Sequence, residues 1–344
     1  GEAMYGSPAA ADVDLDGDLE VLVGSGEIYG WHHTGVEIVD GDGDPSTQGV
    51  LAPQGTGGYR SSIAVGQLDD DPYPEIVGAA WGDVGTPEDP RYEVFAWNAE
   101  DGTVLDGWPV TTSRRCWATP ALGDLDHDGL DEVILPSANG YLYAWKANGT
   151  ELIDGDNNPA TQGIFADLRA NFAYASPALA DLDQDHELEI LVASRCESVF
   201  CFNPDGSPVP GWPVNMGASS RSSIAVGDVN NNGQLEVVAT ANNNQVRLLS
   251  AAGATFPNWP VPCVLMGADF PASPTLADLD GDGDLEIIQP SVEGEIHIWT
   301  WEGDTFPGWP QWLDDGCHSC ASVADVDGDP DLEIVVGCDD GKVY

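Results

Sequence analysis

Acidic side chains recur at alternate positions of a short loop, and this spacing is typical of cation binding. The stretch DLDGDGDLE, residues 278–286, has carboxylates at its first, third, fifth and ninth positions and glycine at its sixth. Alternate side chains of a tightly turned backbone point inward together, and oxygen ligands suit a hard cation such as Ca²⁺. The helix–loop–helix calcium site has its bidentate glutamate at position twelve. The acid at position nine therefore predicts a shorter calcium loop that joins two strands.

The acidic loop occurs seven times in phase along the chain. The copies begin at Asp12, Gln67, Asp124, Asp181, Asp228, Asp278 and Asp325, and each ends in glutamate. One such string is compatible with an ordinary solvated turn, but seven in register favour calcium. The sequence therefore predicts several bound Ca²⁺ ions, up to about seven, with one loop for each repeat.

The candidate metal ligands are the acidic and amide side chains of these loops. They are Asp12, Asp14, Asp16, Asp18, Glu20, Asp69, Asp71, Glu75, Asp124, Asp126, Asp128, Glu132, Asp181, Asp183, Asp185, Glu189, Asp228, Asn230, Asn232, Glu236, Asp278, Asp280, Asp282, Asp284, Glu286, Asp325, Asp327, Asp329, Asp331 and Glu333. The loop at 67 starts with glutamine and contains two prolines, and the loop at 228 has two asparagines in place of acids. Because affinity follows ligand charge and rigidity, these two loops are expected to bind most weakly.

The composition restricts the classes of partner. The chain of 344 residues has 59 acidic against 10 basic side chains, a formal net charge of −49. Phosphate binding needs basic patches, so nucleic acid is not expected as a partner. No apolar run approaches the roughly 18 residues of a membrane span. This net negative charge is expected if some carboxylates bind cations and the others keep the surface repulsive and soluble.

Segments that flank the acidic loops also repeat. A short stretch of small residues precedes each loop, and a β-branched run and then an often aromatic segment follow it. A fourth segment carries GWP or NWP, at residues 107–109, 211–213, 258–260 and 308–310. Four strands in about fifty residues, without helical periodicity, are the pattern of a propeller blade.

We therefore predict an all-β fold, a seven-bladed β-propeller that forms a single domain over residues 1–344. Each blade has four strands, with the calcium loop between the first and second. Repeats one and three carry residues 39–50 and 153–164 in place of the Trp-Pro segment, which predicts longer outer loops. The first of these holds either a further cation site or an Asx-rich turn. The last repeat stops after its third strand, so a further domain or a neighbouring molecule is expected to complete its edge.

Seven cysteines leave at least one without a partner inside the chain. Cys196 and Cys201 are close enough in sequence for a local disulfide, as are Cys317 and Cys320. The CHSC string that holds the second pair is also compatible with a redox or metal motif.

The repeat resembles a known family. Residues 273–288, SPTLADLDGDGDLEII, followed by GEIHIWTWEG and GWP, look like the FG-GAP/VCBS repeat of integrin-α-type propellers. The resemblance extends over essentially the whole chain, and it implies calcium loops on one face. The Phe-Gly start of the signature is replaced by Ser-Pro or Ser-Ser, and the GWP form is similar to repeats of bacterial secreted and surface proteins. It implies a secreted or cell-surface calcium-binding propeller for adhesion or recognition.

A candidate ligand surface lies in the segments just before the first strands. These segments hold Tyr5, Tyr59, Arg60, Arg114, Arg115, Trp117, Tyr174 and Arg221. Aromatic rings and guanidinium groups suit a protein or glycan ligand on the cell surface or matrix, especially one that bears carboxylates. The alternative is that the arginines pair with the abundant acids and the aromatic rings pack between blades.

No nucleophile–base motif stands out, so we do not expect an enzyme. Two alternatives to a recognition module remain. A calcium-dependent polysaccharide lyase would draw on Arg114, Arg115, Tyr59 and His318. A structural subunit of an extracellular filament or surface layer would use an unpaired edge of the last blade for self-association.

Overall fold

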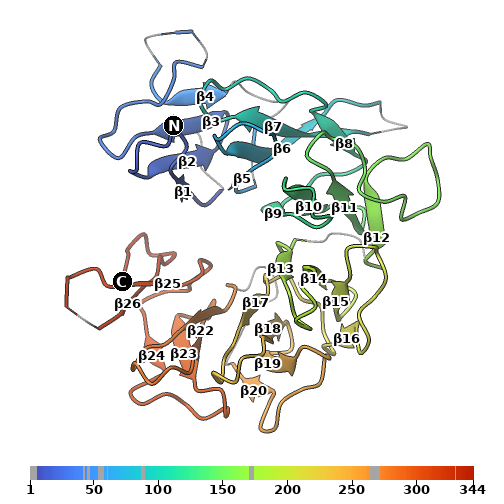
Figure 1. Ribbon diagram of the computed structural model, residues 1–344. Helices are drawn as coiled ribbons and strands as arrows, with labels where there is room; N and C mark the ends of the chain where they lie inside the picture. Colours follow the sequence, from blue (N-terminus) through green and yellow to red (C-terminus); the bar gives the residue numbers. More distant parts are fainter. Residues whose placement is uncertain are drawn as a thin grey trace. The chain divides into compact units, whose positions relative to one another are not determined.

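In the computed structural model, the regular elements of the described residues are all β-strands (Figure 1). It describes residues 6–41, 43–44, 47–52, 58–59, 61–86, 90–169, 174–263, 272–329 and 331–344. Within these ranges no helix is long and apolar enough to cross a membrane.

The strands of the first half follow one another in groups of four. They are β1 (Ala9–Ala11), β2 (Glu20–Gly24), β3 (Ile28–Trp31), β4 (Val50–Ala52), β5 (Ala64–Gly66), β6 (Glu75–Asp83), β7 (Tyr92–Asn98), β8 (Val110–Thr112), β9 (Ala121–Gly123), β10 (Glu132–Pro136), β11 (Tyr141–Trp145) and β12 (Ile164–Asp167). Each group forms one antiparallel sheet in sequence order.

The second half continues the pattern. Its strands are β13 (Ala178–Ala180), β14 (Glu189–Ser194), β15 (Ser198–Phe202), β16 (Val214–Asn215), β17 (Ala225–Gly227), β18 (Glu236–Ala241), β19 (Gln245–Ser250), β20 (Val261–Pro262), β21 (Thr275–Ala277), β22 (Glu286–Pro290), β23 (Glu295–Trp299), β24 (Gln311–Trp312), β25 (Ser322–Ala324) and β26 (Glu333–Val335). Three sheets have four strands, and β25 and β26 form a two-stranded sheet. A single bridge, Gly337 to Val343, follows where the third strand is expected.

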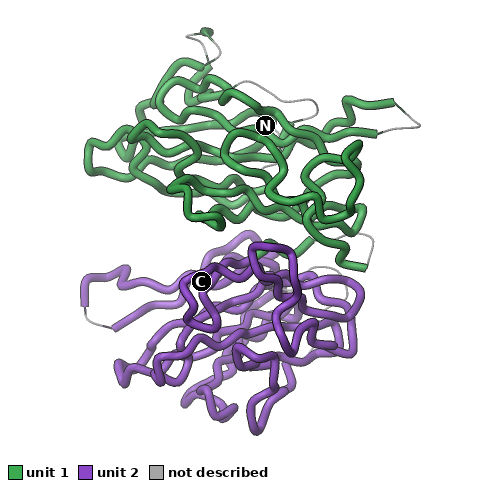
Figure 2. Tube along the Cα trace, turned by 45° about the vertical axis from the view of Figure 1, so that its right-hand side comes forward, with its two compact units in different colours: residues 1–177 green, residues 178–344 purple. Residues whose placement is uncertain are grey.

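The chain divides into two compact units, residues 1–177 and 178–344 (Figure 2). Within the first unit β1, β5 and β9 lie next to one another, and within the second unit β13, β17 and β21 do the same. First strands of consecutive sheets are thus neighbours, as they are in propeller blades. The all-β, four-strand prediction is confirmed for six repeats, and the predicted single domain stays a prediction.

Tryptophans of the GWP and NWP segments join consecutive blades. Trp108, Trp212 and Trp259 are each 7% exposed, and each indole Nε1–H donates to a backbone carbonyl of the next repeat at 2.8 Å. The acceptors are Ala147, Ala251 and Trp301. Trp309 packs against the core of its own half. These tryptophans therefore pack between or within blades, and the fourth strand begins directly after the Trp-Pro segment in each case.

Repeats one and three reach their fourth strand through a longer loop, as predicted. In repeat three Gly163 has φ +79° and lies against Trp145, where a Cβ would stand 2.1 Å from the indole Nε1. Gly49 stands in the same relation to Trp31. Only glycine fits both this backbone and this contact. The candidate cation site in residues 39–50 includes Asp42, which lies outside the described residues.

The disulfide is not either of the two local pairs that the sequence suggested. Cys317 bonds Cys338 instead, with Cα atoms 4.6 Å apart, while Cys196, Cys201 and Cys320 are free thiols. Hydrogen bonds across the last repeat bring the two segments together, because Asp339 N–H donates to Gly316 O at 2.9 Å. Spacing in sequence could not show this pairing, since it depends on register between distant segments.

Candidate metal centres and a candidate ligand surface

The seven acidic loops join the first and second strands of their repeats. In every loop the ninth-position glutamate is the first residue of the second strand; these are Glu20, Glu75, Glu132, Glu189, Glu236, Glu286 and Glu333. The residue opposite it on the first strand is always alanine or glycine. A small partner leaves room for a carboxylate inside the hairpin, and the first six glutamates are at most 2% exposed.

One oxygen of each glutamate closes its loop. The Oε2 atom accepts a hydrogen bond from the backbone N–H of the second loop residue, and this bond occurs in all seven repeats. The donors are Val13, Leu68, Leu125, Leu182, Val229, Leu279 and Val326. The glutamate therefore holds the backbone of the turn in place and also supplies a negative charge to the loop.

Backbone amides also orient the aspartates. In the loop at 124, Asp124 Oδ2 accepts from Gly129 N–H at 3.1 Å, and Asp128 Oδ1 accepts from Leu130 N–H at 3.0 Å. The loops at 12, 181, 228 and 278 repeat the first of these bonds. In the loops at 181, 228 and 278 the other oxygen of this aspartate also accepts a backbone N–H. In the loops at 12 and 124 that oxygen is buried and has no hydrogen-bond partner among the described residues.

Several buried carboxylate oxygens of the loops have no hydrogen-bond partner. Among the described residues, Asp124 Oδ1 and Glu132 Oε1 are buried and accept no hydrogen bond, and the same holds for Glu75 Oε1 and Glu189 Oε1. Carboxylate oxygens of Asp124, Asp126 and Glu132 lie within 4.8 Å of one another. A buried charge without a partner is costly, and coordination of a metal ion is one of the arrangements that stabilise it.

Burial raises the pKa of these glutamates. Removal from water, followed by repulsion from the loop aspartates, raises the pKa of Glu75, Glu132 and Glu286 to about 7 and that of Glu189 to about 6. The hydrogen bond from the loop backbone acts in the opposite direction but is the smaller effect. The loops therefore favour a positive charge between their carboxylates.

In two loops a side-chain nitrogen of the protein bonds loop oxygens for which a cation would have to compete. Gln67 Nε2 donates to the carbonyls of Asp69 at 2.8 Å and Asp71 at 2.5 Å, so its amide occupies the inside of that turn. In the loop at 124 the ammonium group of Lys146 bonds Asp126 Oδ2. The first contact agrees with the expectation that the loop at 67 is weak.

Two of the predicted ligands at the seventh loop position make contacts outside their loops. Asp284 Oδ2 accepts from Trp301 Nε1–H at 2.8 Å, and Asp18 Oδ2 lies 3.5 Å from His33 Nδ1. Both carboxylates are therefore engaged by side chains from outside their loop, whereas the first, third, fifth and ninth positions face inward.

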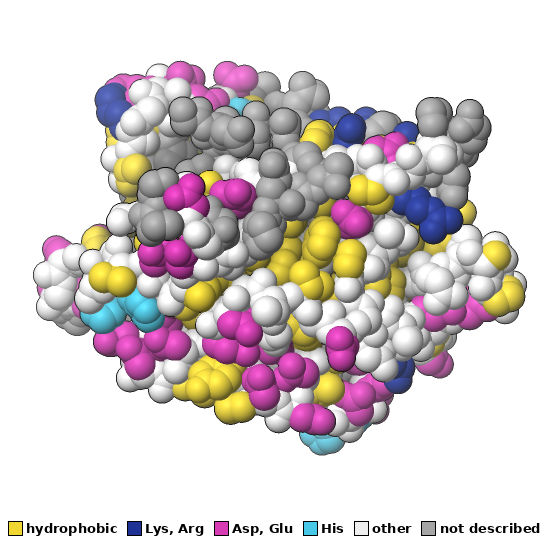
Figure 3. All heavy atoms as spheres, turned by 90° about the horizontal axis from the view of Figure 1, so that it is seen from above, with side chains coloured by type: hydrophobic (Ala, Val, Ile, Leu, Met, Phe, Trp, Pro, Cys, Tyr) yellow, Lys and Arg dark blue, Asp and Glu magenta, His cyan; other side chains and the backbone are white. Residues whose placement is uncertain are grey.

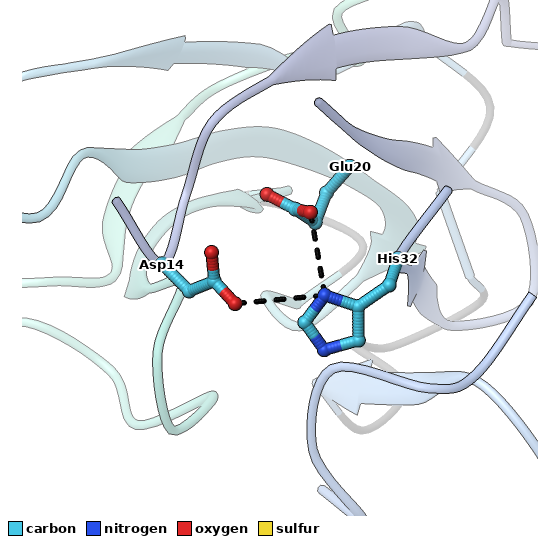
Figure 4. Close-up of side chains that lie close together, drawn as sticks. All are labelled: Asp14, Glu20 and His32. Atoms are coloured by element: carbon cyan, nitrogen blue, oxygen red, sulfur yellow. Dashed lines mark hydrogen bonds and ion pairs between the residues drawn. The ribbon is translucent and has the colours of Figure 1, made fainter. Parts of the chain in front are cut away.

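A histidine that the sequence analysis left unassigned joins the first loop. His32 Nδ1 lies 3.3 Å from Glu20 Oε1 and 3.5 Å from Asp14 Oδ2 (Figure 4). His32 directly follows the last residue of β3, and this strand pairs with β2, which starts with Glu20. The sequence signal that could have identified His32 is its place directly after the often aromatic third strand.

The predicted ligand surface is only partly present. Tyr5 and Arg60 lie outside the described residues. Tyr59 is 1% exposed and packs edge-on against Phe95 and Trp97, with ring centroids 6.4 and 5.3 Å away, so it belongs to the core rather than to a surface. Arg221 lies in the second unit and the other candidates in the first.

Arg115, Trp117 and Tyr174 do come together. Trp117 contacts Tyr174 with centroids 4.7 Å apart, and Trp81 lies 5.5 Å from Trp117 on its other side. The Arg115 guanidinium lies 4.5 Å over the Trp81 ring, and its Nε–H donates to Trp81 O at 3.1 Å. We call these four residues the aromatic–arginine cluster. Arg114, next to it in sequence, is exposed.

Acidic side chains are spread widely over the face shown in Figure 3, where they outnumber the basic ones. This distribution agrees with the formal net charge of −49. A guanidinium group inside an aromatic cluster is therefore unusual for this surface.

Antiparallel sheets of four consecutive strands, each with an acidic loop between its first two strands, define an all-β repeat protein of the propeller class. The family model described as "FG-GAP-like repeat" matches residues 124–192 and 228–289. These ranges contain the loops at 124, 181, 228 and 278. The search of the curated proteins found no match.

Solved structures share the fold. Saccharomyces cerevisiae Sqt1 is 11% identical with a TM-score of 0.61, over 100% of this chain and 82% of that one. BBS1N, solved in complex with ARL6DN, is 10% identical with a TM-score of 0.58, over 99% and 91%. The Vibrio cholerae biofilm matrix protein Bap1 is 21% identical with a TM-score of 0.54, over 80% of this chain and 42% of that one.

Proposed function

We propose that the chain is a calcium-stabilised recognition module that acts outside the cell. The observation that carries the calcium part is the pair of buried oxygens, Asp124 Oδ1 and Glu132 Oε1, which accept no hydrogen bond from the described residues. They lie in one group with a carboxylate oxygen of Asp126. A divalent cation between them neutralises charges that burial otherwise makes costly.

Calcium fits these loops better than the other common divalent ions. The inward-facing donors of the loop at 124 are all oxygens, and Ca²⁺ takes six to eight oxygen ligands in a flexible geometry. Carboxylates in the loops at 124, 181, 278 and 325 occupy the first, third, fifth and ninth positions. Mg²⁺ demands near-ideal octahedral geometry and keeps several of its waters, which suits a closed turn less well.

Thermal unfolding with and without Ca²⁺ tests the metal part. The protein is passed over a chelating resin, and its melting temperature is measured in EGTA and in excess Ca²⁺, with Mg²⁺ as the control ion. We expect a large increase in Ca²⁺ and a smaller one in Mg²⁺, because binding to the folded state alone stabilises it. An unchanged melting temperature in EGTA would refute the proposal.

The recognition part is supported by the aromatic–arginine cluster and by the similarity to a biofilm matrix protein. Aromatic faces and guanidinium groups bind sugars and carboxylates, and Arg115 is already held in place by Trp81. A glycan array compares the wild type with Trp117→Ala and, as a matched control, Trp312→Ala, whose tryptophan is 68% exposed. Loss of a glycan signal in the first variant only supports the cluster. Equal signals in all three proteins would exclude it as the binding surface.

A specific observation favours one further candidate, a subunit of an extracellular assembly. The last sheet has only β25 and β26 within the described residues, and Val326 and Val343 nearby are 62% and 72% exposed. An edge of this kind pairs readily with a strand from another molecule. Size-exclusion chromatography with and without Ca²⁺ separates the candidates, because a strictly monomeric protein under both conditions counts against assembly.

A further inference from the structure

The residue after the third strand faces the acidic loop, and in the first repeat it is an imidazole. His32 follows β3, with its Nδ1 3.3 Å from Glu20 Oε1 and 3.5 Å from Asp14 Oδ2 (Figure 4). The equivalent residues are those whose N–H groups make the same turn bond after the third strand. In repeats two to six they are Asn98, Lys146, Asn203, Ser250 and Thr300. The nitrogen donor of the first repeat is therefore a local difference and not part of the repeat.

His32 Nδ1 makes a long hydrogen bond to Glu20 Oε1 and an ion-pair contact with Asp14 Oδ2, and both are longer than a typical charged hydrogen bond. Such bonds between a nitrogen donor and a carboxylate measure about 2.7–2.9 Å. The protein itself provides the comparison, because His297 Nε2 lies 2.7 Å from Glu295 Oε2. His32 makes two longer contacts of nearly equal length instead, at 3.3 Å and 3.5 Å.

The same separations suit ligands of one small metal ion. A tetrahedral ion with bonds of about 2.1 Å holds its ligand atoms about 3.4 Å apart. The distances from His32 Nδ1 are 3.3 Å and 3.5 Å. The donors, one imidazole nitrogen and two carboxylate oxygens within 4.8 Å of one another, are of the kinds that zinc-class ions bind.

The protein aims both carboxylates at this point. Glu20 is 0% exposed, and its other oxygen, Oε2, accepts from Val13 N–H at 3.0 Å. Asp14 Oδ1 accepts from Asp16 N–H at 3.2 Å, which leaves Oδ2 toward the imidazole. In the loops at 67, 124 and 181 the oxygen that corresponds to Glu20 Oε1 is buried with no hydrogen-bond partner in the part of the chain that is described. In the first loop the place of that missing partner is taken by His32, whose Nδ1 contacts Glu20 Oε1.

We propose that His32, Glu20 and Asp14 form a site for a zinc-class transition-metal ion, with a fourth position open to water. Imidazole nitrogen suits Zn²⁺, Co²⁺ and Ni²⁺, whereas Ca²⁺ takes oxygen ligands. The proposal goes beyond the calcium function, because it needs only the geometry of the first repeat. It would hold even if the other six loops bound no calcium.

The test is a titration with Zn²⁺ in the presence of excess Ca²⁺. Chelated protein saturated with Ca²⁺ is titrated calorimetrically with Zn²⁺, and Co²⁺ replaces Zn²⁺ in a parallel absorption experiment. We expect one Zn²⁺ per chain and the strong visible bands of tetrahedral Co²⁺. His32→Asn, which installs the residue of repeats two and four, should weaken Zn²⁺ binding at least about 100-fold, more than loss of an outer-shell partner costs.

Two further variants keep the test specific. His186→Asn removes a histidine that also lies near a loop carboxylate, 3.8 Å from Asp181 Oδ2, but is 94% exposed, and it should leave Zn²⁺ binding unchanged. His32→Asp makes all the ligand atoms of the site oxygens. It should therefore weaken Zn²⁺ binding and strengthen Ca²⁺ binding. Equal Zn²⁺ affinity of the wild type and His32→Asn would overturn the proposal, as would complete displacement of Zn²⁺ by Ca²⁺. The calcium count of the other loops, measured on the same samples, reports separately on the proposed function.

Discussion

Glu132 Oε2 accepts the backbone N–H of Leu125 at 2.7 Å, while Oε1 of the same carboxylate is buried and has no hydrogen-bond partner among the described residues. One side chain thus closes the turn with one oxygen and offers the other to a cation. The same first bond occurs in all seven loops. Folding of each hairpin and binding of its ion are therefore expected to be coupled.

Glu132→Gln should have opposite effects on stability with and without Ca²⁺. The amide keeps the shape but removes the charge, so the variant should lose one Ca²⁺ per chain and melt lower than the wild type in excess Ca²⁺. In EGTA it should melt higher, because a buried carboxylate without a counter-ion is gone. Bound calcium is counted by atomic absorption after gel filtration, and melting is followed by circular dichroism.

The matched control is Glu236→Gln in the loop at 228, where only Asp228 and Glu236 are charged at the four inward positions. This variant should leave the count of tightly bound Ca²⁺ unchanged. An unchanged count in Glu132→Gln would contradict the assignment of the ninth position.

Asn230→Asp with Asn232→Asp should add a calcium site. The loop at 228 already has the required backbone, since Val229 N–H bonds Glu236 Oε2 at 2.9 Å and Gly233 N–H bonds Asp228 Oδ2 at 2.8 Å. Only ligand charge is missing, and affinity rises with the number of charged ligands. The double variant should bind one more Ca²⁺ than the wild type in equilibrium dialysis. Failure to gain an ion would show that charge at these positions does not limit binding.

Without calcium, thermal stability should fall as the pH rises from about 4.5 to about 7. Burial raises the pKa of Glu132 from 4.5 to about 7, and Glu75 and Glu286 behave alike. A carboxyl group whose folded pKa is raised binds protons more tightly in the folded state. Its stabilising effect is present below the unfolded pKa and is lost as the pH passes through the folded one.

Calcium should remove this fall, because the ion binds the ionised form and displaces the protons. Melting temperatures are measured across this range in EGTA and in excess Ca²⁺, and proton release is followed on addition of Ca²⁺ near pH 6.5, within the titration range of groups with a pKa of about 7. Parallel pH profiles with and without the ion, and no proton release, would argue against buried glutamates as ligands.

The periodic features of the fold were predictable from the sequence because the same residue pattern recurs in every repeat. The hairpin loops, the second strand that begins at the ninth position and the fourth strand after Trp-Pro all follow from short-range patterns. The hydrogen bond from the Trp108 indole to the next blade also belongs to a contact that recurs with the repeat.

The remaining features depend on single residues at positions that the pattern does not mark. The amide of Gln67 bonds within its own turn, and the imidazole of His32 lies beside Glu20 across a hairpin; a single residue type creates each contact. Tyr59 was expected at a surface because its segment precedes a first strand. Its burial depends on packing against Phe95 and Trp97 of β7, more than thirty residues further along the chain, which the local sequence does not encode.

Trp108→Phe should lower the free energy of unfolding by about 1–3 kcal/mol, because it removes the donor to the Ala147 carbonyl and leaves that acceptor unpaired between two blades. Urea unfolding in excess Ca²⁺ measures the change while every loop stays loaded. Trp312→Phe is the matched control: its side chain is 68% exposed, so the change should stay within about 0.5 kcal/mol. Equal losses in the two variants would mean that the indole hydrogen bond between blades does not carry the effect. A loss confined to Trp108→Phe would assign it to the blade contact.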